Sequence, residues 1–121
     1  MKTFLAIYTG SASFSARVAW DRLSAEERQR RQALGMQAWK EWAELHRATI
    51  VEGGGPLGKT KRISSQGISD IRNNMAAYVI VRAESHEAAA RLFERHPHFS
   101  IFPGDGVEIM ECLPVPQQAR G

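Results

Sequence analysis

The chain has 121 residues, of which 43% are apolar and 24% charged, and its formal net charge is +3. This length fits one domain, and the composition excludes an intrinsically disordered or fibrous protein. We expect a single α+β domain over residues 1–116, followed by a frayed C-terminal tail over residues 117–121. The sequence has no stretch of roughly 18 apolar residues that could span a membrane, and its first apolar run is too short for a signal peptide. A cytoplasmic protein with no membrane partner is therefore expected.

Cysteine and basic residues narrow the function classes further. Cys112 is the only cysteine, so no intrachain disulfide can form, and its apolar surroundings predict a buried side chain in a reducing compartment. Basic residues cluster at positions 28–31 and 59–62, but both clusters are short and lack interleaved aromatic residues. We therefore expect solvated basic surfaces and no nucleic-acid partner.

The first half of the chain predicts a strand, a long helix and a short strand. Residues 3–9 are apolar at both alternating sets of positions, which is typical of a strand buried on both faces. Ser24 and Glu27 form a capping box that starts a helix, and the apolar side chains of this helix cover an arc of about 200°. Residues 48–52 predict a short strand that ends at the break formed by residues 53–56.

The second half predicts a meander followed by a strand, a helix and a last strand. Residues 62–65 and 68–72 suit two short strands around Gln66 and Gly67. Residues 75–83 form an apolar strand, Ser85 can cap a helix over residues 85–95, and residues 107–113 form the last strand.

This order of elements predicts an α+β fold with a ferredoxin-like antiparallel sheet and two helices on one face. The strands are apolar on both sides, whereas two helices can cover only one face of the sheet. The exposed apolar area would exceed what monomers tolerate. We therefore expect a homodimer in which two sheets pack face to face.

Five segments of the chain carry a resemblance to a known family: residues 53–58 (GGGPLG), 78–81 (YVIV), 85–89 (SHEAA), 96–99 (HPHF) and 107–112 (VEIMEC). Together they resemble the YCII-related (DGPF-like) proteins of the dimeric α+β barrel superfamily. The resemblance implies a ferredoxin-like protomer, a dimeric α+β barrel and a pocket between helix and sheet. Residues 69–74 (SDIRNN) depart from the Asp-Gly-Pro-Phe signature, and the N-terminal segment lacks the Arg-x-x-His pattern of the YCII branch. The His–Asp dyad of that branch is therefore not transferred.

Residues 53–60 (GGGPLGKT) match the phosphate-loop pattern at every fixed position. A functional phosphate loop needs a helix that begins at Lys59 and Thr60, but the following residues are β-branched and interrupted by glycine. We expect a glycine loop with a basic end, which could at most hold an anion weakly.

Histidines supply the candidate chemistry. His46 falls within the apolar arc of the long helix between Trp39 and Trp42, where it is either a hydrogen-bonded core residue or a pocket acid or base. His96 and His98 flank Pro97 and could approach one metal ion with Glu108 or Glu111, but two histidines and an unplaced carboxylate are a weak metal signal. A helix-end histidine is equally well explained as a stabiliser of the helix dipole.

The sequence favours a pocket that binds a small hydrophobic or aromatic metabolite, with possible His/Glu acid–base chemistry. The predicted catalytic residues are His46, His98 and Glu111, and the predicted ligand-binding residues are Trp39, Trp42, Tyr78 and His96. No metal and no cofactor are predicted. The alternative is a non-catalytic homodimeric interaction or regulatory module in which all these residues are structural. An enzyme should leave a cavity between Trp39, His46 and the sheet, whereas such a module should fill this space with side chains.

Overall fold

The computed structural model describes residues 1–10, 20–94, 96 and 104–115, and the statements below concern these residues. The frayed tail predicted for residues 117–121 lies outside them. No helix of the described part of the chain is long and apolar enough to cross a membrane.

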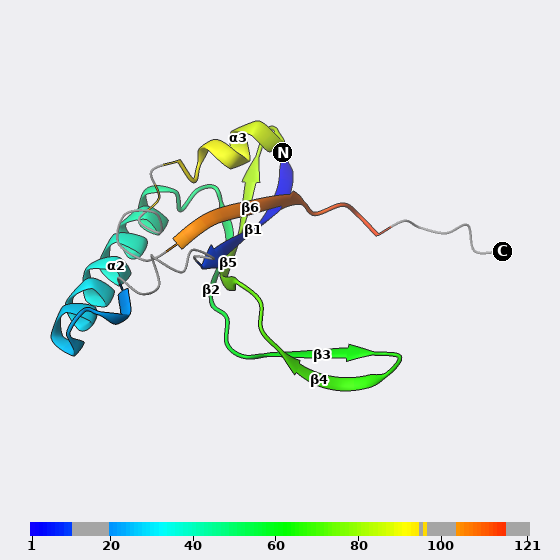
Figure 1. The fold of residues 1–121 in the computed structure, drawn as a ribbon. Helices are drawn as coiled ribbons and strands as arrows, with labels where there is room; N and C mark the ends of the chain where they lie inside the picture. Colours follow the sequence, from blue (N-terminus) through cyan, green and yellow to red (C-terminus); the bar gives the residue numbers. More distant parts are fainter. Residues whose placement is uncertain (11–19, 95, 97–103, 116–121) are drawn as a thin grey trace.

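A four-stranded antiparallel sheet forms the centre of the molecule (Figure 1). Its strands follow the order β2-β5-β1-β6, where the bounds are β1 (Lys2–Gly10), β2 (Ile50–Pro56), β5 (Met75–Ala83) and β6 (Gly104–Glu111). Helix α2 (Ala25–Leu45) connects β1 to β2, and helix α3 (His86–Arg91) connects β5 to β6. Two βαβ units with this strand order make a ferredoxin-like fold, which confirms the predicted fold of the protomer.

A separate two-stranded hairpin stands between β2 and β5 in the sequence. Its strands are β3 (Thr60–Ser64) and β4 (Gly67–Ile71), and neither pairs with the central sheet. Gly67 has a φ of 111°, a conformation that residues with a Cβ rarely adopt, and it fixes the turn between the two strands. Thr60 begins a strand, so Lys59 and Thr60 do not open the helix that a phosphate loop requires.

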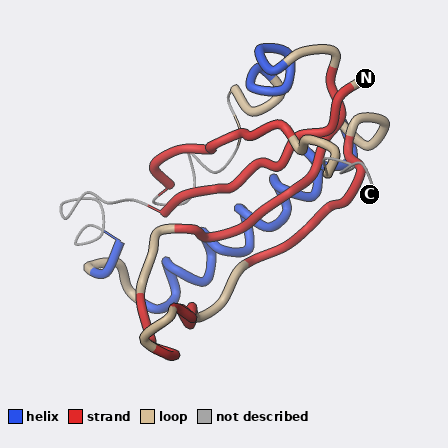
Figure 2. Tube along the Cα trace, turned by 90° about the vertical axis from the view of Figure 1, so that its right-hand side faces the viewer, coloured by secondary structure: helices blue, strands red, loops and turns tan. Residues whose placement is uncertain are grey.

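One face of the sheet carries the core. Phe4, Ala6 and Tyr8 of β1 lie opposite Val81, Val79 and Ala77 of β5, and all six side chains are buried. Both described helices supply side chains to this core; those of α2 are Trp39 and Trp42, and those of α3 are Ala88 and Ala89. The helix α2 accordingly lies behind the sheet in Figure 2.

The opposite face of the sheet, called the open face below, has no described helix against it. Its larger apolar side chains are Leu5, Ile7, Tyr78, Ile80 and Met110. All of these are half-buried except Met110, which is exposed. Burial of β1 on both faces was predicted, but within one chain only the helix-covered face of β1 is fully buried.

Side-chain caps explain where the helices start, and tighter turns explain why α3 is short. The hydroxyls of Ser24 and Ser85 accept hydrogen bonds from the backbone amides of Glu27 and Ala88, which confirms both serine caps. The Glu27 carboxylate of the predicted capping box pairs with Arg30 and Arg31. After Arg91 the backbone amides of Leu92, Phe93 and Glu94 bond three residues back instead of four. The predicted helix over residues 85–95 therefore ends early as an α-helix and continues as turns.

Strand β2 corrects the expectation that the glycines of residues 53–56 break the strand. They continue β2 as far as Pro56, and the register shifts on both sides of Glu52 absorb the irregularity. Gly54 has a φ of 60°, and a Cβ at this position would lie 2.0 Å from the backbone oxygen of Tyr78. Only glycine allows this close approach of β2 to β5.

Two expectations about burial were wrong. Cys112 is exposed: it follows the end of β6 at Glu111, and although its amide still donates a 2.8 Å hydrogen bond to the backbone oxygen of Thr3, its side chain meets solvent. The apolar arc of α2 is narrower than its sequence predicts, since Leu34, Met36 and Leu45 are exposed whereas Trp39 and Trp42 pack on the core. One sheet face takes up only a limited stripe of a helix, and residues beyond that stripe meet solvent.

Candidate functional site

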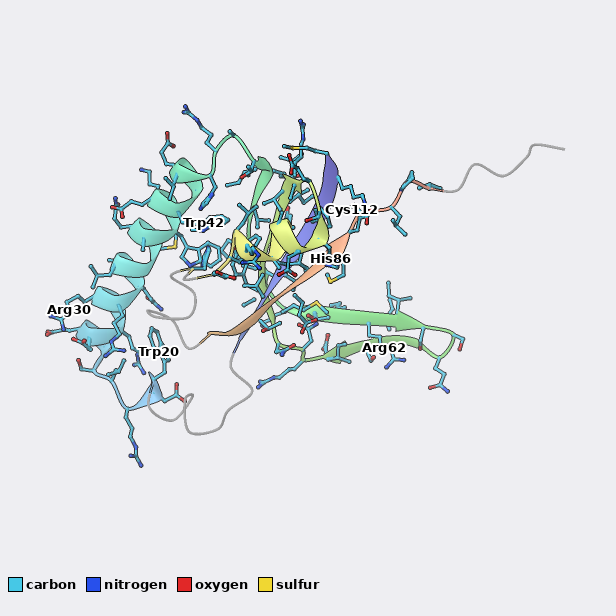
Figure 3. All side chains as sticks on the ribbon, turned by 90° about the horizontal axis from the view of Figure 1, so that it is seen from above. Trp20, Arg30, Trp42, Arg62, His86 and Cys112 are labelled. Atoms are coloured by element: carbon cyan, nitrogen blue, oxygen red, sulfur yellow. The ribbon has the colours of Figure 1, made fainter. Side chains whose placement is uncertain are left out.

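Five ring-bearing side chains meet between α2, α3 and the helix-covered face of the sheet. We call Tyr8, Trp39, Trp42, Phe93 and His96 the aromatic cluster. Figure 3 shows the Trp42 side chain extending from α2 toward the sheet and α3. His96 is fully buried, although imidazoles usually keep some contact with water.

The imidazole of His96 lies at the centre of this cluster. Its ring centroid is 4.5 Å from that of Trp42, 4.8 Å from that of Trp39 and 4.9 Å from that of Tyr8. Both tryptophans meet the imidazole with steeply inclined planes, at 88° for Trp39 and 63° for Trp42. Edge-to-face contacts of this kind favour planar, polarisable rings over aliphatic groups.

A buried hydrogen bond joins His96 to the sheet. The hydroxyl of Tyr8 lies 3.1 Å from Nε2 of His96. Burial raises the pKa of Tyr8 well above its ordinary value of 10.0, so the hydroxyl keeps its proton and can donate it to an unprotonated Nε2. The pair therefore places one imidazole and one neutral phenol beside the described rings of Trp39, Trp42 and Phe93.

Local structure fixes each member of the cluster. Tyr8 shares its side of β1 with Phe4 and Ala6, because side chains alternate along a strand. Trp39 and Trp42 are three residues apart and so lie on one face of α2, and Nε1 of Trp42 donates a hydrogen bond of 3.2 Å to the backbone oxygen of Leu92. The amide of His96 donates to the backbone oxygen of Phe93, which holds the histidine in the turn after α3.

Three of the predicted site residues belong to this cluster, and a fourth lies beside it. The structure brings Trp39, Trp42 and His96 together, and their role in ligand binding stays a prediction. His46 is half-buried at the C-terminal cap of α2, where its ring contacts Trp42 at a centroid distance of 4.8 Å. Its backbone oxygen accepts hydrogen bonds from Thr49, so His46 also ends the helix. His98 lies outside the described residues.

The structure does not bring Tyr78 and Glu111 to the cluster. Tyr78 lies on the open face, where its hydroxyl donates a hydrogen bond of 3.2 Å to Oε1 of Glu52. Glu111 lies opposite Phe4, four strand positions or roughly 13 Å beyond the residue opposite Tyr8. Its carboxylate is partly exposed and lies 4.0 Å from Nζ of Lys2.

The structure places neither Glu108 nor Glu111 where it could complete a metal site with His96. Glu108 shares the open face with Ile7, whereas His96 lies under the helices, and Glu111 is at the far end of β6. Within the described part of the chain, no group of three or more histidine, cysteine, aspartate or glutamate side chains could hold a metal ion.

Sequence reasoning did not assign Tyr8 and Phe93 to the site. The signal for Tyr8 was present, because its strand position matches that of the core residues Phe4 and Ala6. Its pairing with His96, 88 residues away, depends on how β1 lies against the turn after α3, which no local pattern reveals.

Comparison with known proteins leaves the family open. No protein-family model matches the sequence, and no curated protein matches it. The chain is similar in structure to 5-chloro-2-hydroxyhydroquinone dehydrochlorinase (TftG) from Burkholderia phenoliruptrix AC1100, solved in complex with 2,5-dihydroxybenzoquinone. The two share 19% sequence identity, with 89% of this chain and 90% of that chain covered and a TM-score of 0.49. The fold assignment rests on this chain's own strand order and register.

Proposed function

We propose that the chain is a YCII-related homodimer that binds a small aromatic or hydrophobic compound at the aromatic cluster. The observation that carries this proposal is the fully buried His96, enclosed by Trp39 and Trp42 and joined to the hydroxyl of Tyr8. Binding sites for small molecules are mostly apolar with a few placed polar groups, and this cluster has that composition.

The polar pair gives the proposed site its chemistry. The imidazole of His96 can accept or release a proton, and the neutral phenol of Tyr8 can donate its hydrogen bond to Nε2 and so fix the orientation of that ring. A phenol, an aromatic acid or a related planar compound could contact the tryptophan rings while an oxygen meets His96. We also propose His46 and His98 as catalytic residues. His46 contacts the ring of Trp42, and His98 lies two residues after His96 in the sequence.

The proposed function also includes a homodimeric state and a cytoplasmic location. A second copy would cover the open face, whose apolar side chains no described helix touches. The single cysteine, Cys112, has an exposed thiol, which suits the reducing cytoplasm.

A specific observation favours the second candidate, a non-catalytic homodimeric module. The imidazole of His96 itself occupies the space between Trp39, Trp42 and Tyr8, as expected where a chain fills this space with its own side chains. In that case the aromatic cluster is a structural core, and the function belongs to the dimer surface.

A ligand screen separates the two candidates. Thermal shifts would be measured with benzoate, salicylate, phenol and simple aliphatic acids, and each shift would be followed by calorimetric titration. We expect an aromatic compound to bind, and we expect His96→Ala and Trp39→Leu to weaken its binding at least tenfold. Tyr78→Phe is the matched control, because Tyr78 lies on the open face and should leave the affinity unchanged. If no compound shifts the melting temperature, the module is the better description.

A further inference from the structure

The β3–β4 hairpin is the part of the described chain that the core explains least. Residues 61–71 are exposed throughout, and the two strands pair only with each other. An isolated two-stranded hairpin is marginally stable in water and usually needs packing against another element. Neither the aromatic cluster nor the protomer core uses this hairpin.

The hairpin points away from the helices. In Figure 1 it leaves the sheet on the side opposite α2, and Figure 3 shows the same arrangement from above, with Arg62 far from the helix layer. In Figure 2, which looks at the open face, the hairpin is foreshortened because it extends toward the viewer. The hairpin therefore projects from the side of the sheet that carries the open face.

Apolar side chains lie near the end of this projection. Ile63 and Ile68 face each other across the two strands, and they are 77% and 70% exposed. The segment after β6 extends from the same side of the sheet, and it carries exposed Leu113 and Val115 (Figures 1 and 3). Two projections with exposed aliphatic side chains thus flank the open face.

We infer that the β3–β4 hairpin is an arm that embraces a second copy of the chain seated on the open face. This inference rests on the proposed homodimer and assigns it a specific contact. Stacked sheets lie about 10 Å apart, and five strand residues extend about 16 Å. The arm is therefore long enough to cross the interval between two sheets, so that Ile63 and Ile68 reach the edge of the partner's sheet.

The charged residues at the base of the arm also favour a second copy of the chain as the molecule that lies on the open face. The base of the arm borders an open cavity of about 760 Å³. The charged residues that line this cavity are Lys59, Lys61, Asp70 and Arg72. Asp70 pairs with Lys61 at 2.7 Å, so Lys59 and Arg72 leave this cavity basic. The open face carries the exposed carboxylates of Glu52 and Glu108 beside the exposed guanidinium of Arg82, so a second copy offers acidic groups that Lys59 and Arg72 could pair with. In a twofold dimer each arm meets the same surface on the other copy, so both contacts form together.

Sedimentation velocity of the full chain over a concentration series tests the arm. We expect the double variant Ile63→Ser, Ile68→Ser to weaken the dimer at least tenfold. The matched control is Arg62→Ala, Ser69→Ala, which alters the neighbouring cross-strand pair on the other side of the hairpin and should change the affinity less than twofold. If the isoleucine variant dimerises as tightly as the wild type, the hairpin is not a dimer contact, although the chain is still a homodimer. If the wild type is a monomer, both the hairpin contact and the homodimer are wrong.

Hydrogen exchange of the wild type provides a second measurement that needs no variant. If the arm lies on a partner, the amides of residues 60–71 exchange more slowly at high protein concentration than at a concentration where the dimer dissociates. Equal exchange in a dimeric and a dissociated sample contradicts the arm, whatever the variants do.

Discussion

At the scale of single residues, the pKa values of the two tyrosines of the chain are raised for different reasons. Burial under the helices raises the pKa of Tyr8. On the open face, the charge of the Glu52 carboxylate and its hydrogen bond raise the pKa of Tyr78. Because the chain has only these two tyrosines, each single phenylalanine variant leaves one phenol to observe.

We predict that Tyr8 stays protonated for as long as the protein is folded. In Tyr78→Phe, ultraviolet absorbance should show no tyrosinate until the protein unfolds. In Tyr8→Phe, the remaining Tyr78 should titrate above its ordinary value of 10.0 and return toward it in the added presence of Glu52→Gln. A tyrosinate signal from folded Tyr78→Phe near pH 10 would show that the phenol of Tyr8 is not buried.

The same burial predicts how stability depends on pH. The folded-state pKa of Tyr8 is raised, so its contribution is complete below the unfolded value of 10.0 and is lost as the pH rises above that value. Urea unfolding should show a free energy of unfolding that falls above pH 10 in the wild type and falls less steeply in Tyr8→Phe. Equal slopes for the two proteins would contradict a buried phenol.

At the scale of elements, strand β2 depends on one glycine. Gly54→Ala would force a Cβ against the backbone oxygen of Tyr78 at a φ of 60°, so β2 must move away from β5. We predict a loss of about 2–4 kcal/mol in the free energy of unfolding, measured by urea titration. Gly53→Ala is the matched control, since nothing lies within 4 Å of its added Cβ, and it should change stability by less than about 1 kcal/mol. Similar losses in both variants would refute the close approach.

Elements with local signals could be predicted, and contacts between distant elements could not. Strand β5 matches its predicted bounds, and both serine caps form, because alternation and capping act within a few residues. The glycines of β2 look like a break in sequence, but pairing with β5 extends the strand through them. Likewise, Trp39, Trp42 and His96 could be named from composition and spacing, whereas the Tyr8 partner of His96 depends on tertiary packing.

At the scale of the whole molecule, the proposed homodimer depends on the open face. Leu5, Ile7 and Ile80 occupy the two central strands, where charged side chains would ordinarily keep a single sheet face soluble. The exposed Arg82 and Glu108 bring both signs of charge to the same face, so two copies can meet without net repulsion. A twofold interface uses the same patch twice, which doubles the effect of any substitution within it.

We predict that Ile7→Glu converts the protein from a dimer to a monomer. Each dimer would have to bury two carboxylates at the centre of the interface, which costs about 2–5 kcal/mol when no partner charge is present. Sedimentation of the variant at micromolar concentration measures the change, and circular dichroism confirms that the sheet is retained. Met36→Glu is the matched control, because Met36 is an exposed apolar residue on α2, in the helix layer behind the sheet, and this variant should remain dimeric. If Ile7→Glu stays dimeric while Met36→Glu dissociates, the copies meet through the helix layer instead of the open face.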